Sequence, residues 1–300
     1  MNYTNAATSR RRPAPSPAWR LIYSGVAAAG ILFGGTLTYS NAVLADHPVG
    51  YWRLGESGGA TAADSSGFGR DGTYIGGVTL GVPGAIPADP NTAVRFDGSG
   101  SYVDIAGGPF NFPNNFTLEA WVINNNTSVP PLIAPRFFSN RTFNGANSGG
   151  YGVGVLTNGA IRFTLFARQD INSSVVVPFD GLFHYVAVTF DSSNVAMIYL
   201  DGVLRQTAIA SRPAGNSTTD LLIGRSIAGD PDWRGVIDEA AIYNYVLTSD
   251  QIGSHYAAAV PEPRTFGLLG LASLFLLCAG PTKEHRKSSP GRSIYRRGLS

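Results

Sequence analysis

The sequence predicts an all-β sandwich of antiparallel strands, and three observations lead to that prediction. Side chains in residues 182–205 alternate with a period of two, which is typical of strands and not of helices. The chain contains 37 Gly and 19 Pro, residues that are frequent in the turns between short strands. Its 300 residues are 44% hydrophobic, which is enough for the core of one large domain.

Residues 182–205 are expected to form three strands joined by two tight turns. In the first strand, His184, Val186 and Phe190 share one face. Asp201-Gly202 fits a two-residue hairpin turn, because both central positions of such a turn need positive φ. A meander of this kind leaves one apolar face bare, so a second sheet must cover it.

The rest of the predicted domain also reads as short strands, followed by one helix. Strands are expected at residues 47–56, 93–98, 101–105, 116–123, 151–156, 161–166 and 236–243, with a turn-rich loop at 64–72. Thr248 can cap a short helix after the last strand, and Gln251 completes a capping box. Ile252 and Tyr256 are four residues apart and would pack this helix onto the sandwich.

The charge of the predicted domain argues against nucleic acid as a partner. The formal net charge of the whole chain is +2, but residues 46–263 hold 11 Arg, no Lys and 19 acidic residues, a net charge of −8. An acidic body does not attract nucleic acid or anionic lipid. The single cysteine, Cys278, rules out an internal disulfide and a cysteine-based metal cluster.

The N-terminal part of the chain is typical of a secretory signal. Residues 1–20 are basic, residues 21–39 are apolar, and small residues follow at 42–45. This order predicts a signal peptide over residues 1–45, with cleavage after Ala45. An uncleaved membrane anchor is the alternative, because the apolar run approaches spanning length.

Several motifs follow one another along the predicted domain. They are YWRLGE, DSSG, VRFDG with SYVDI, FTLEAWV, FHYVAVTFD with IYLDGVL, and GVIDEAAIYNYVLTSDQIGSHY. Over residues 46–258 this order resembles the LamG-like, concanavalin A-like lectin/glucanase family. The resemblance implies a jelly roll of two antiparallel sheets.

The C-terminal residues 259–300 resemble a PEP-CTERM sorting signal. The motif Val260-Pro261-Glu262-Pro263 precedes an apolar segment at 265–280, which is expected to be a transmembrane helix, and a basic tail at 281–300. The resemblance implies processing by an exosortase in a Gram-negative-type bacterium. The protein is therefore expected at the outer cell surface or in the extracellular matrix, with transient or permanent anchoring in the inner membrane. A plain C-terminal anchor is the alternative.

Catalysis is not expected from this sequence. Glycosidases need two carboxylates that flank the scissile bond, and glucanases of the resembling family carry a Glu-x-Asp-x-x-Glu strand, which this chain lacks. Its nearest approach is Asp238-Glu239, whose side chains are expected on opposite faces of a strand. His184 has no accompanying nucleophile motif and is expected simply to lie on a sheet face.

A structural Ca²⁺ ion is the one cofactor that the sequence suggests. The resembling family often holds such an ion with carboxylate and carbonyl oxygens. Asp64 and Asp238 are the candidate ligands, and Asp97 is a weaker one. For each of the three, an Asx turn or a solvated carboxylate is the alternative.

Ligand contacts are expected from two loops on the rim of the sandwich. The first, 124–150, is long and polar and contains Arg136 together with three phenylalanines. The second, 226–234, presents Trp233 beside Asp230 and Asp232. Sugar rings stack on exposed aromatic rings, and carboxylates bind hydroxyl groups. The alternative is that Trp233 only closes the edge of the sandwich; Trp52 and Trp121 are expected in the core.

Together these features predict an exported surface or matrix protein with a non-catalytic, carbohydrate-binding domain. Its expected partners are an extracellular polysaccharide, an exosortase and the membrane. A structural or adhesive protein without sugar specificity is one alternative. A divergent glycoside hydrolase is another.

Overall fold

The computed structural model describes residues 38–260 except 88, 108–109, 128–132, 143–147 and 227–229. The predicted signal segment up to residue 37, Pro261–Pro263 of the sorting motif, the apolar segment 265–280 and the basic tail lie outside the described residues. Among the described residues, no helix is long and apolar enough to cross a membrane.

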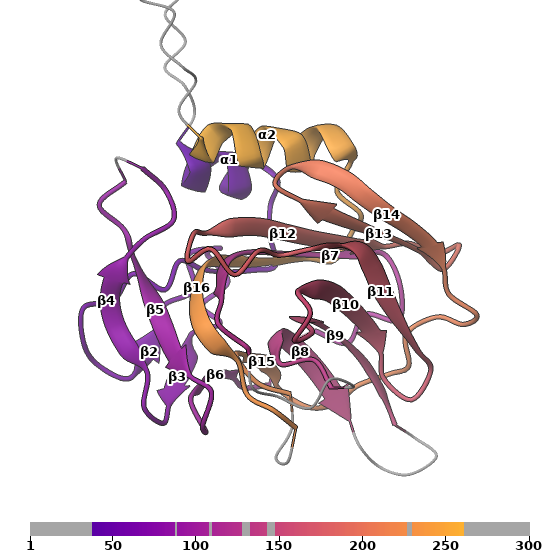
Figure 1. The fold of residues 1–300 in the computed structure, drawn as a ribbon, viewed down its shortest axis with the longest axis horizontal. Coiled ribbons are helices and arrows are strands. Elements are labelled where there is room, and N and C mark those ends of the chain that lie inside the picture. The colour runs from indigo at the N-terminus through magenta and orange to yellow at the C-terminus, as the bar shows by residue number, and fades with distance from the viewer. Residues whose placement is uncertain are drawn as a thin grey trace, which may run out of the picture. The chain divides into compact units, whose positions relative to one another are not determined.

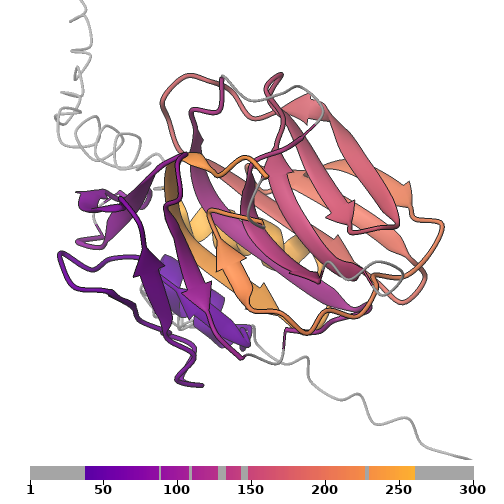
Figure 2. The same cartoon turned by 90° about the horizontal axis from the view of Figure 1, so that it is seen from below.

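The domain is a sandwich of two antiparallel sheets (Figures 1 and 2). Sheet A has the strand order β14-β13-β12-β7-β16-β5-β4, with β1 also paired to β16. Its strands are β1 (Gly50–Trp52), β4 (Thr79–Pro83), β5 (Thr92–Asp97), β7 (Phe116–Asn124), β12 (His184–Phe190), β13 (Val195–Leu200), β14 (Val203–Ile209) and β16 (Arg234–Tyr243). The prediction of an all-β antiparallel sandwich is confirmed.

Sheet B covers the inner face of sheet A and has the order β11-β10-β9-β8-β15-β6-β3-β2. Its strands are β2 (Thr61–Ala62), β3 (Gly72–Ile75), β6 (Tyr102–Ile105), β8 (Arg136–Thr142), β9 (Gly149–Val155), β10 (Ala160–Leu165), β11 (Gln169–Val176) and β15 (Leu221–Ile223). Two stacked antiparallel sheets of this kind are consistent with a jelly roll.

The alternation of the predicted meander places one set of side chains in the core between the sheets. Val186, Val188 and Phe190 of β12 are fully buried there. They lie opposite Ala120, Leu118 and Phe116 of β7 in the antiparallel register. The first turn and the Asp201-Gly202 turn both form, and Asp201 adopts a positive φ of 53°. Trp52 is buried in the same core, as predicted.

The expected loop 124–150 is wrong over part of its length, because it contains strand β8 and the start of β9. Phe137 and Phe138 are consecutive, yet both are buried in the core. A register shift between Arg136 and Phe138 turns two neighbouring side chains inward. This bulge breaks the period of two, so the strand was not recognised from its alternation.

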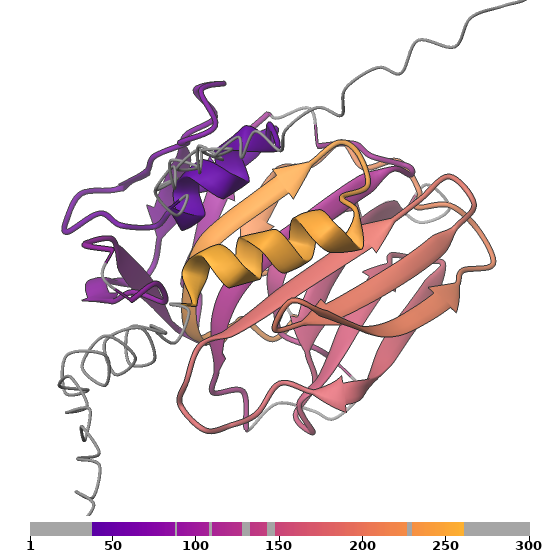
Figure 3. The ribbon, with the colours of Figure 1, turned by 90° about the horizontal axis from the view of Figure 1, so that it is seen from above.

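Two helices, α1 (Tyr39–Ala45) and α2 (Ser249–Ala259), lie side by side on the outer face of sheet A (Figures 1 and 3). The capping box of Thr248 and Gln251 is present, as predicted. Ile252 is fully buried. The ring of Tyr256 stacks on Trp121 with 5.7 Å between centroids. A second apolar cluster therefore lies beneath the helices, and Trp121 belongs to it.

Helix α1 lies inside the segment that the sequence predicts to be cleaved, yet it packs on the domain. Tyr39 is 1% exposed and Val43 is 0% exposed, and both belong to the apolar cluster beneath the helices. Tyr39 also contacts His255 of α2 edge to face, with 6.5 Å between ring centroids. The packed part of the chain thus begins before Asp46.

A buried polar network joins α2 to sheet A. Glu119 is fully buried and accepts hydrogen bonds from the hydroxyl groups of Tyr185 and Tyr243. The imidazole Nδ1 of His255 lies 3.1 Å from Glu119 Oε2, and its Nε2 lies 3.0 Å from Asp46 Oδ2. Burial alone would lower the pKa of His255, but the charges and hydrogen bonds of the two carboxylates outweigh it and raise the pKa above its usual value.

This raised pKa sets the pH dependence of stability. A group whose pKa is higher in the folded state stabilises the fold fully below its unfolded pKa, which is about 6.5 for histidine. That contribution is lost as the pH rises through the folded pKa. We expect the free energy of unfolding, measured by urea titration, to fall as the pH rises above about 6.5, and to fall less steeply in His255→Asn. An equal slope in both proteins would contradict this assignment.

Candidate functional site

A hollow of about 320 Å³ lies on the outer face of sheet B. We call it the sheet B hollow; its main lining residues are Tyr102 and Asp104 of β6, Arg141 of β8, Leu222 of β15, and the flanking Asp220 and Arg225. The alternation of β6 explains its chemistry. Val103 and Ile105 are buried in the core, so Tyr102 and Asp104 must face outward.

Two arginines of the sheet B hollow are held against aromatic rings. The guanidinium carbon of Arg225 lies 4.8 Å from the ring centroid of Tyr102. That of Arg141 lies 4.7 Å from the ring centroid of Phe166. Such cation–π contacts fix the position of both partners. The hollow therefore presents an ordered, partly exposed tyrosine ring with hydrogen-bond donors at its side.

Two carboxyl groups of the sheet B hollow lie together. Asp104 is opposite Leu222 in the register of β6 and β15, so Asp220, two residues before Leu222, is its diagonal neighbour on the same face. Burial, and the charge of Asp220 beside it, raise the pKa of Asp104 above its usual range. Asp104 Oδ1 is buried and has no hydrogen-bond partner among the described residues. Both residues are partly exposed, so a ligand hydroxyl can reach this pair of carboxyl groups, although Asp104 Oδ1 itself is enclosed.

Two of the predicted ligand residues, Asp230 and Asp232, form ion pairs with arginines that line this hollow. Asp230 forms an ion pair with Arg141 at 2.6 Å, and Asp232 forms one with Arg225 at 3.2 Å. Asp232 also accepts a hydrogen bond from the backbone N–H of Gly100 at 2.6 Å. Their carboxylates hold the two arginines in place and are already engaged by these contacts.

The other two predicted ligand residues are buried. Arg136 is 5% exposed and donates a hydrogen bond of 2.6 Å to Thr164, and burial lowers its pKa to about 10. Trp233 is 0% exposed, and its ring packs edge to face on Phe137 in the core. The expectation that Trp233 offers its ring for stacking is therefore wrong, because the ring closes the sandwich instead.

The residues that line the hollow were not recognised from the sequence. The motif SYVDI predicts a strand, and the alternation of that strand places Tyr102 and Asp104 on one face. Asp220 and Arg225 carry no motif of their own. They reach the site only because β15 pairs with both β6 and β8.

The three predicted calcium ligands do not fit a metal site in this structure. No group of three or more His, Cys, Asp or Glu side chains that could hold a metal ion occurs in the described part of the chain. Each carboxylate already accepts hydrogen bonds: Asp64 from the N–H groups of Tyr51, Ser66 and Arg70, Asp97 from Ser99 and Ser101, and Asp238 from Ala85. Asp64 and Asp97 form Asx turns, the alternative to metal binding.

Removal of calcium is therefore expected to leave the fold unchanged. We expect EDTA, followed by excess Ca²⁺, to shift the melting temperature by less than about 1 °C, because the carboxylate oxygens are satisfied by N–H and O–H donors. A fall in melting temperature that Ca²⁺ restores would show that these carboxylates do bind the ion.

The expected separation of Asp238 and Glu239 onto opposite faces is also wrong. Residues 238–241 of β16 lie opposite residues 121–119 of β7, so β16 contains one extra residue. Glu239 takes up this bulge with a φ of 51°. The amide of Asn91 then reaches both carboxylates, at 3.4 Å from Asp238 Oδ1 and 3.2 Å from Glu239 Oε1.

Arg53 neutralises part of this carboxylate pair. Its Nη2 lies 2.9 Å from Glu239 Oε1 and 2.8 Å from Asp89 Oδ2. Burial, and then the neighbouring Glu239, raise the pKa of Asp238 well above its usual value. Asp238 and Glu239 are at most 1% exposed, so a polymeric substrate has no access to them. The cluster links β16 to Arg53, Asp89 and Asn91.

Residues 97–253 match the family model of the concanavalin A-like lectin/glucanases superfamily, and the chain belongs to this superfamily. The match runs from the end of β5 into α2, so it includes the sheet B hollow. Comparison with curated proteins finds no match.

Solved structures with this fold include domain 4 of an extracellular arabinanase from Geobacillus stearothermophilus, in complex with arabinotriose. It is 18% identical with a TM-score of 0.54, over 70% of this chain and 98% of that one. The binding domain of botulinum neurotoxin D/C in complex with SialylT is 16% identical with a TM-score of 0.54, over 72% of this chain and 52% of that one. This chain thus spans about half of the neurotoxin structure. At such identities the likeness shows the fold alone.

Proposed function

We propose that this protein binds a glycan in the sheet B hollow. The observation that carries the proposal is the position of Tyr102. Its ring is partly exposed on an open sheet face, beside hydrogen-bond donors from arginines and acceptors from aspartates. Sugar rings pack on aromatic rings, while guanidinium and carboxyl groups bind the hydroxyls around the ring. Membership of a lectin/glucanase superfamily supports this reading, as does the arabinotriose bound to domain 4 of the arabinanase.

We propose further that binding occurs without hydrolysis. The two carboxyl groups of glycosidases lie about 5–9 Å apart, so that the scissile bond fits between them. Asp104 and Asp220 are close enough for their carboxyl groups to interact directly, which leaves no room for that bond. No release of reducing ends from a bound polysaccharide is the expected result. Release that disappears in Asp104→Asn would favour a hydrolase instead.

The proposed site is tested by glycan binding. We expect Tyr102→Ala to weaken binding to the best oligosaccharide from a glycan screen about tenfold, and Tyr102→Phe to weaken it less, because the ring supplies most of the contact. Isothermal titration calorimetry measures both. The control is Phe68→Ala, which removes an exposed ring, 59% accessible, outside the hollow.

Two results would contradict the proposed site. Equal affinity of Tyr102→Ala and the unchanged protein would place the glycan elsewhere. Absence of binding to every glycan in the screen would favour a structural or adhesive protein without sugar specificity.

We propose that the domain acts outside the cell. The order of basic, apolar and small residues at the N-terminus and the sorting motif at residues 260–263 support export and C-terminal processing by an exosortase. Fractionation of the host tests this proposal. Deletion of residues 260–300 is expected to release the protein from cells into the medium, and retention of the shortened protein in the cell envelope would contradict the role of this segment.

A further inference from the structure

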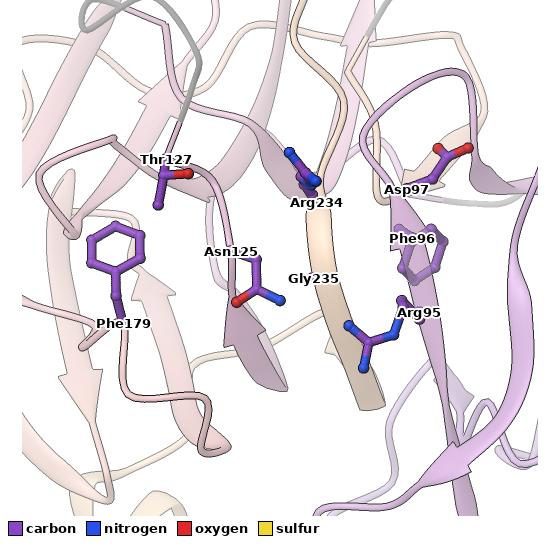
Figure 4. A pocket seen from close by; sticks show the side chains of 8 residues that line it. All are labelled: Arg95, Phe96, Asp97, Asn125, Thr127, Phe179, Arg234 and Gly235. Carbon is purple, nitrogen blue, oxygen red and sulfur yellow. The ribbon is translucent and has the colours of Figure 1, made fainter.

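A second pocket, of about 510 Å³, lies on the rim of the sandwich where β7 and β5 end and β16 begins (Figure 4). We call it the rim pocket; its lining includes Arg95, Asp97, Asn125, Thr127, Phe179 and Arg234. Because Phe96 and Ile237 point into the core, Arg95 and Arg234 lie on the outer face of sheet A. The rim pocket is therefore separate from the hollow on sheet B.

The two arginines of the rim pocket have no charged partner in the described part of the chain. Both are exposed, and no described residue forms an ion pair or a hydrogen bond with either guanidinium group. Arg95 lies opposite Val236 and Arg234 lies opposite Asp97, so the arginines are diagonal neighbours, with Cβ atoms about 7–8 Å apart. Other arginines of the domain, among them Arg53, Arg141 and Arg225, are ion-paired.

The acidic residue of the rim pocket does not cancel this positive charge. Asp97 Oδ1 accepts hydrogen bonds of 2.7 Å from the N–H of Ser99 and 2.6 Å from the hydroxyl of Ser101, which fix it within its own turn. The pocket thus carries two guanidinium groups and one carboxylate. This local excess of positive charge stands out in a segment with a net charge of −8.

The backbone around Arg234 is firmly held. Its N–H donates to Asn126 Oδ1 at 2.8 Å, and its carbonyl accepts from the N–H of Asn125 at 3.0 Å. At Gly235 the chains approach so closely that a Cβ atom would lie 1.9 Å from the carbonyl oxygen of Ile123. The start of β16, which carries Arg234, is therefore fixed relative to Asn125 before any ligand binds.

The rest of the rim pocket suits a sugar. Phe179 is 44% exposed, and Figure 4 shows it at one end of the pocket, with Asn125 between it and the two arginines. Thr127 adds a hydroxyl beside Phe179. An aromatic ring at one end, an amide and a hydroxyl beside it, and two unpaired guanidinium groups beyond them match a sugar ring that bears a carboxylate.

We propose that the rim pocket binds an acidic sugar unit of a polysaccharide. Arg95 and Arg234 pair with its carboxylate, and Phe179 packs on the ring. Neutral sugars lack the group that the arginines recognise, so charge decides the specificity of this pocket. Binding weakens as the salt concentration rises, because the arginines are exposed.

The test uses trigalacturonate and its methyl ester, which keeps the sugar rings and removes the charge. We expect the full-length protein to bind trigalacturonate, measured by isothermal titration calorimetry, and to bind the methyl ester at least about tenfold more weakly. Arg95→Gln and Arg234→Gln should each lose about tenfold in affinity. Arg205→Gln, at an exposed arginine on the far edge strand β14, is the matched control and should bind like the unchanged protein.

A sialylated trisaccharide, whose carboxylate is attached differently to the ring, distinguishes the two sources of acidic sugar. Binding of either probe that both arginine variants lose supports the proposal. Equal binding of acid and ester, unchanged affinity in both variants, or no binding of either acidic probe would overturn it. Tyr102→Ala leaves the rim pocket intact, so its affinity for the acidic probe separates this proposal from the proposed site on sheet B.

Discussion

Replacement of Glu119 with leucine is expected to lower the free energy of unfolding by about 3–5 kcal/mol, because it breaks a fully buried charged network by removing one partner. Glu119 is 0% exposed and accepts hydrogen bonds from two tyrosine hydroxyl groups, one of them, that of Tyr243, at 2.9 Å. It also lies 3.1 Å from His255. Leucine would leave these donors in the apolar cluster beneath the helices without an acceptor.

Glu119→Gln is the matched variant, because it keeps a side-chain acceptor and removes the charge. We expect it to be more stable than Glu119→Leu and less stable than the unchanged protein. Urea unfolding at pH 6, followed by far-ultraviolet circular dichroism, measures all three. Equal stability of Glu119→Leu and Glu119→Gln would contradict this prediction, because the buried hydroxyl and imidazole groups would then not depend on Glu119.

Removal of residues 1–45 is expected to destabilise the domain by about 3–6 kcal/mol, since two buried side chains contribute about 1.5–3 kcal/mol each. A chain that begins at Asp46 lacks Tyr39 and Val43, which are buried against Trp121 and α2. Loss of α1 also uncovers His255, which Tyr39 contacts. The comparison protein begins at Thr38 and keeps the whole helix.

The controls for this truncation compare a buried and an exposed side chain of α1. In the chain that begins at Thr38, Val43→Asp should destabilise strongly, whereas Asn41→Ala, at an exposed position, should change the free energy of unfolding by less than about 0.5 kcal/mol. Equal stability of the two chain lengths would show that α1 contributes nothing. The packing of α1 also favours a mature N-terminus before Thr38, which mass spectrometry of the protein isolated from its host measures.

The sequence predicts those parts of the fold whose signals are local. The strands at 184–205 follow from alternation, the Asp201-Gly202 turn from its requirement for positive φ, and the cap of α2 from Thr248 and Gln251. Strand β8 and the shared face of Asp238 and Glu239 could not be predicted from the sequence, and the reason is the same in both cases. Each contains a bulge that shifts the alternation, and a bulge becomes visible only against the partner strand.

The candidate site was predicted only in part. The second rim loop does reach it, because Asp230 and Asp232 hold Arg141 and Arg225. The prediction for Trp233 is wrong because a tryptophan between Asp232 and Arg234 looks exposed in a sequence, while the start of β16 turns its ring into the core. Tyr102 and Asp220 meet across more than a hundred residues, so only strand pairing brings them together.

The most direct test of glycan binding on sheet B is a crystal structure of the protein with an oligosaccharide that it binds. We predict a sugar ring packed on Tyr102, with a hydroxyl group within hydrogen-bonding distance of the Asp220 carboxyl group or the Arg225 guanidinium group, which line the same hollow. A bound sugar that makes no contact with the outer face of sheet B would contradict the account.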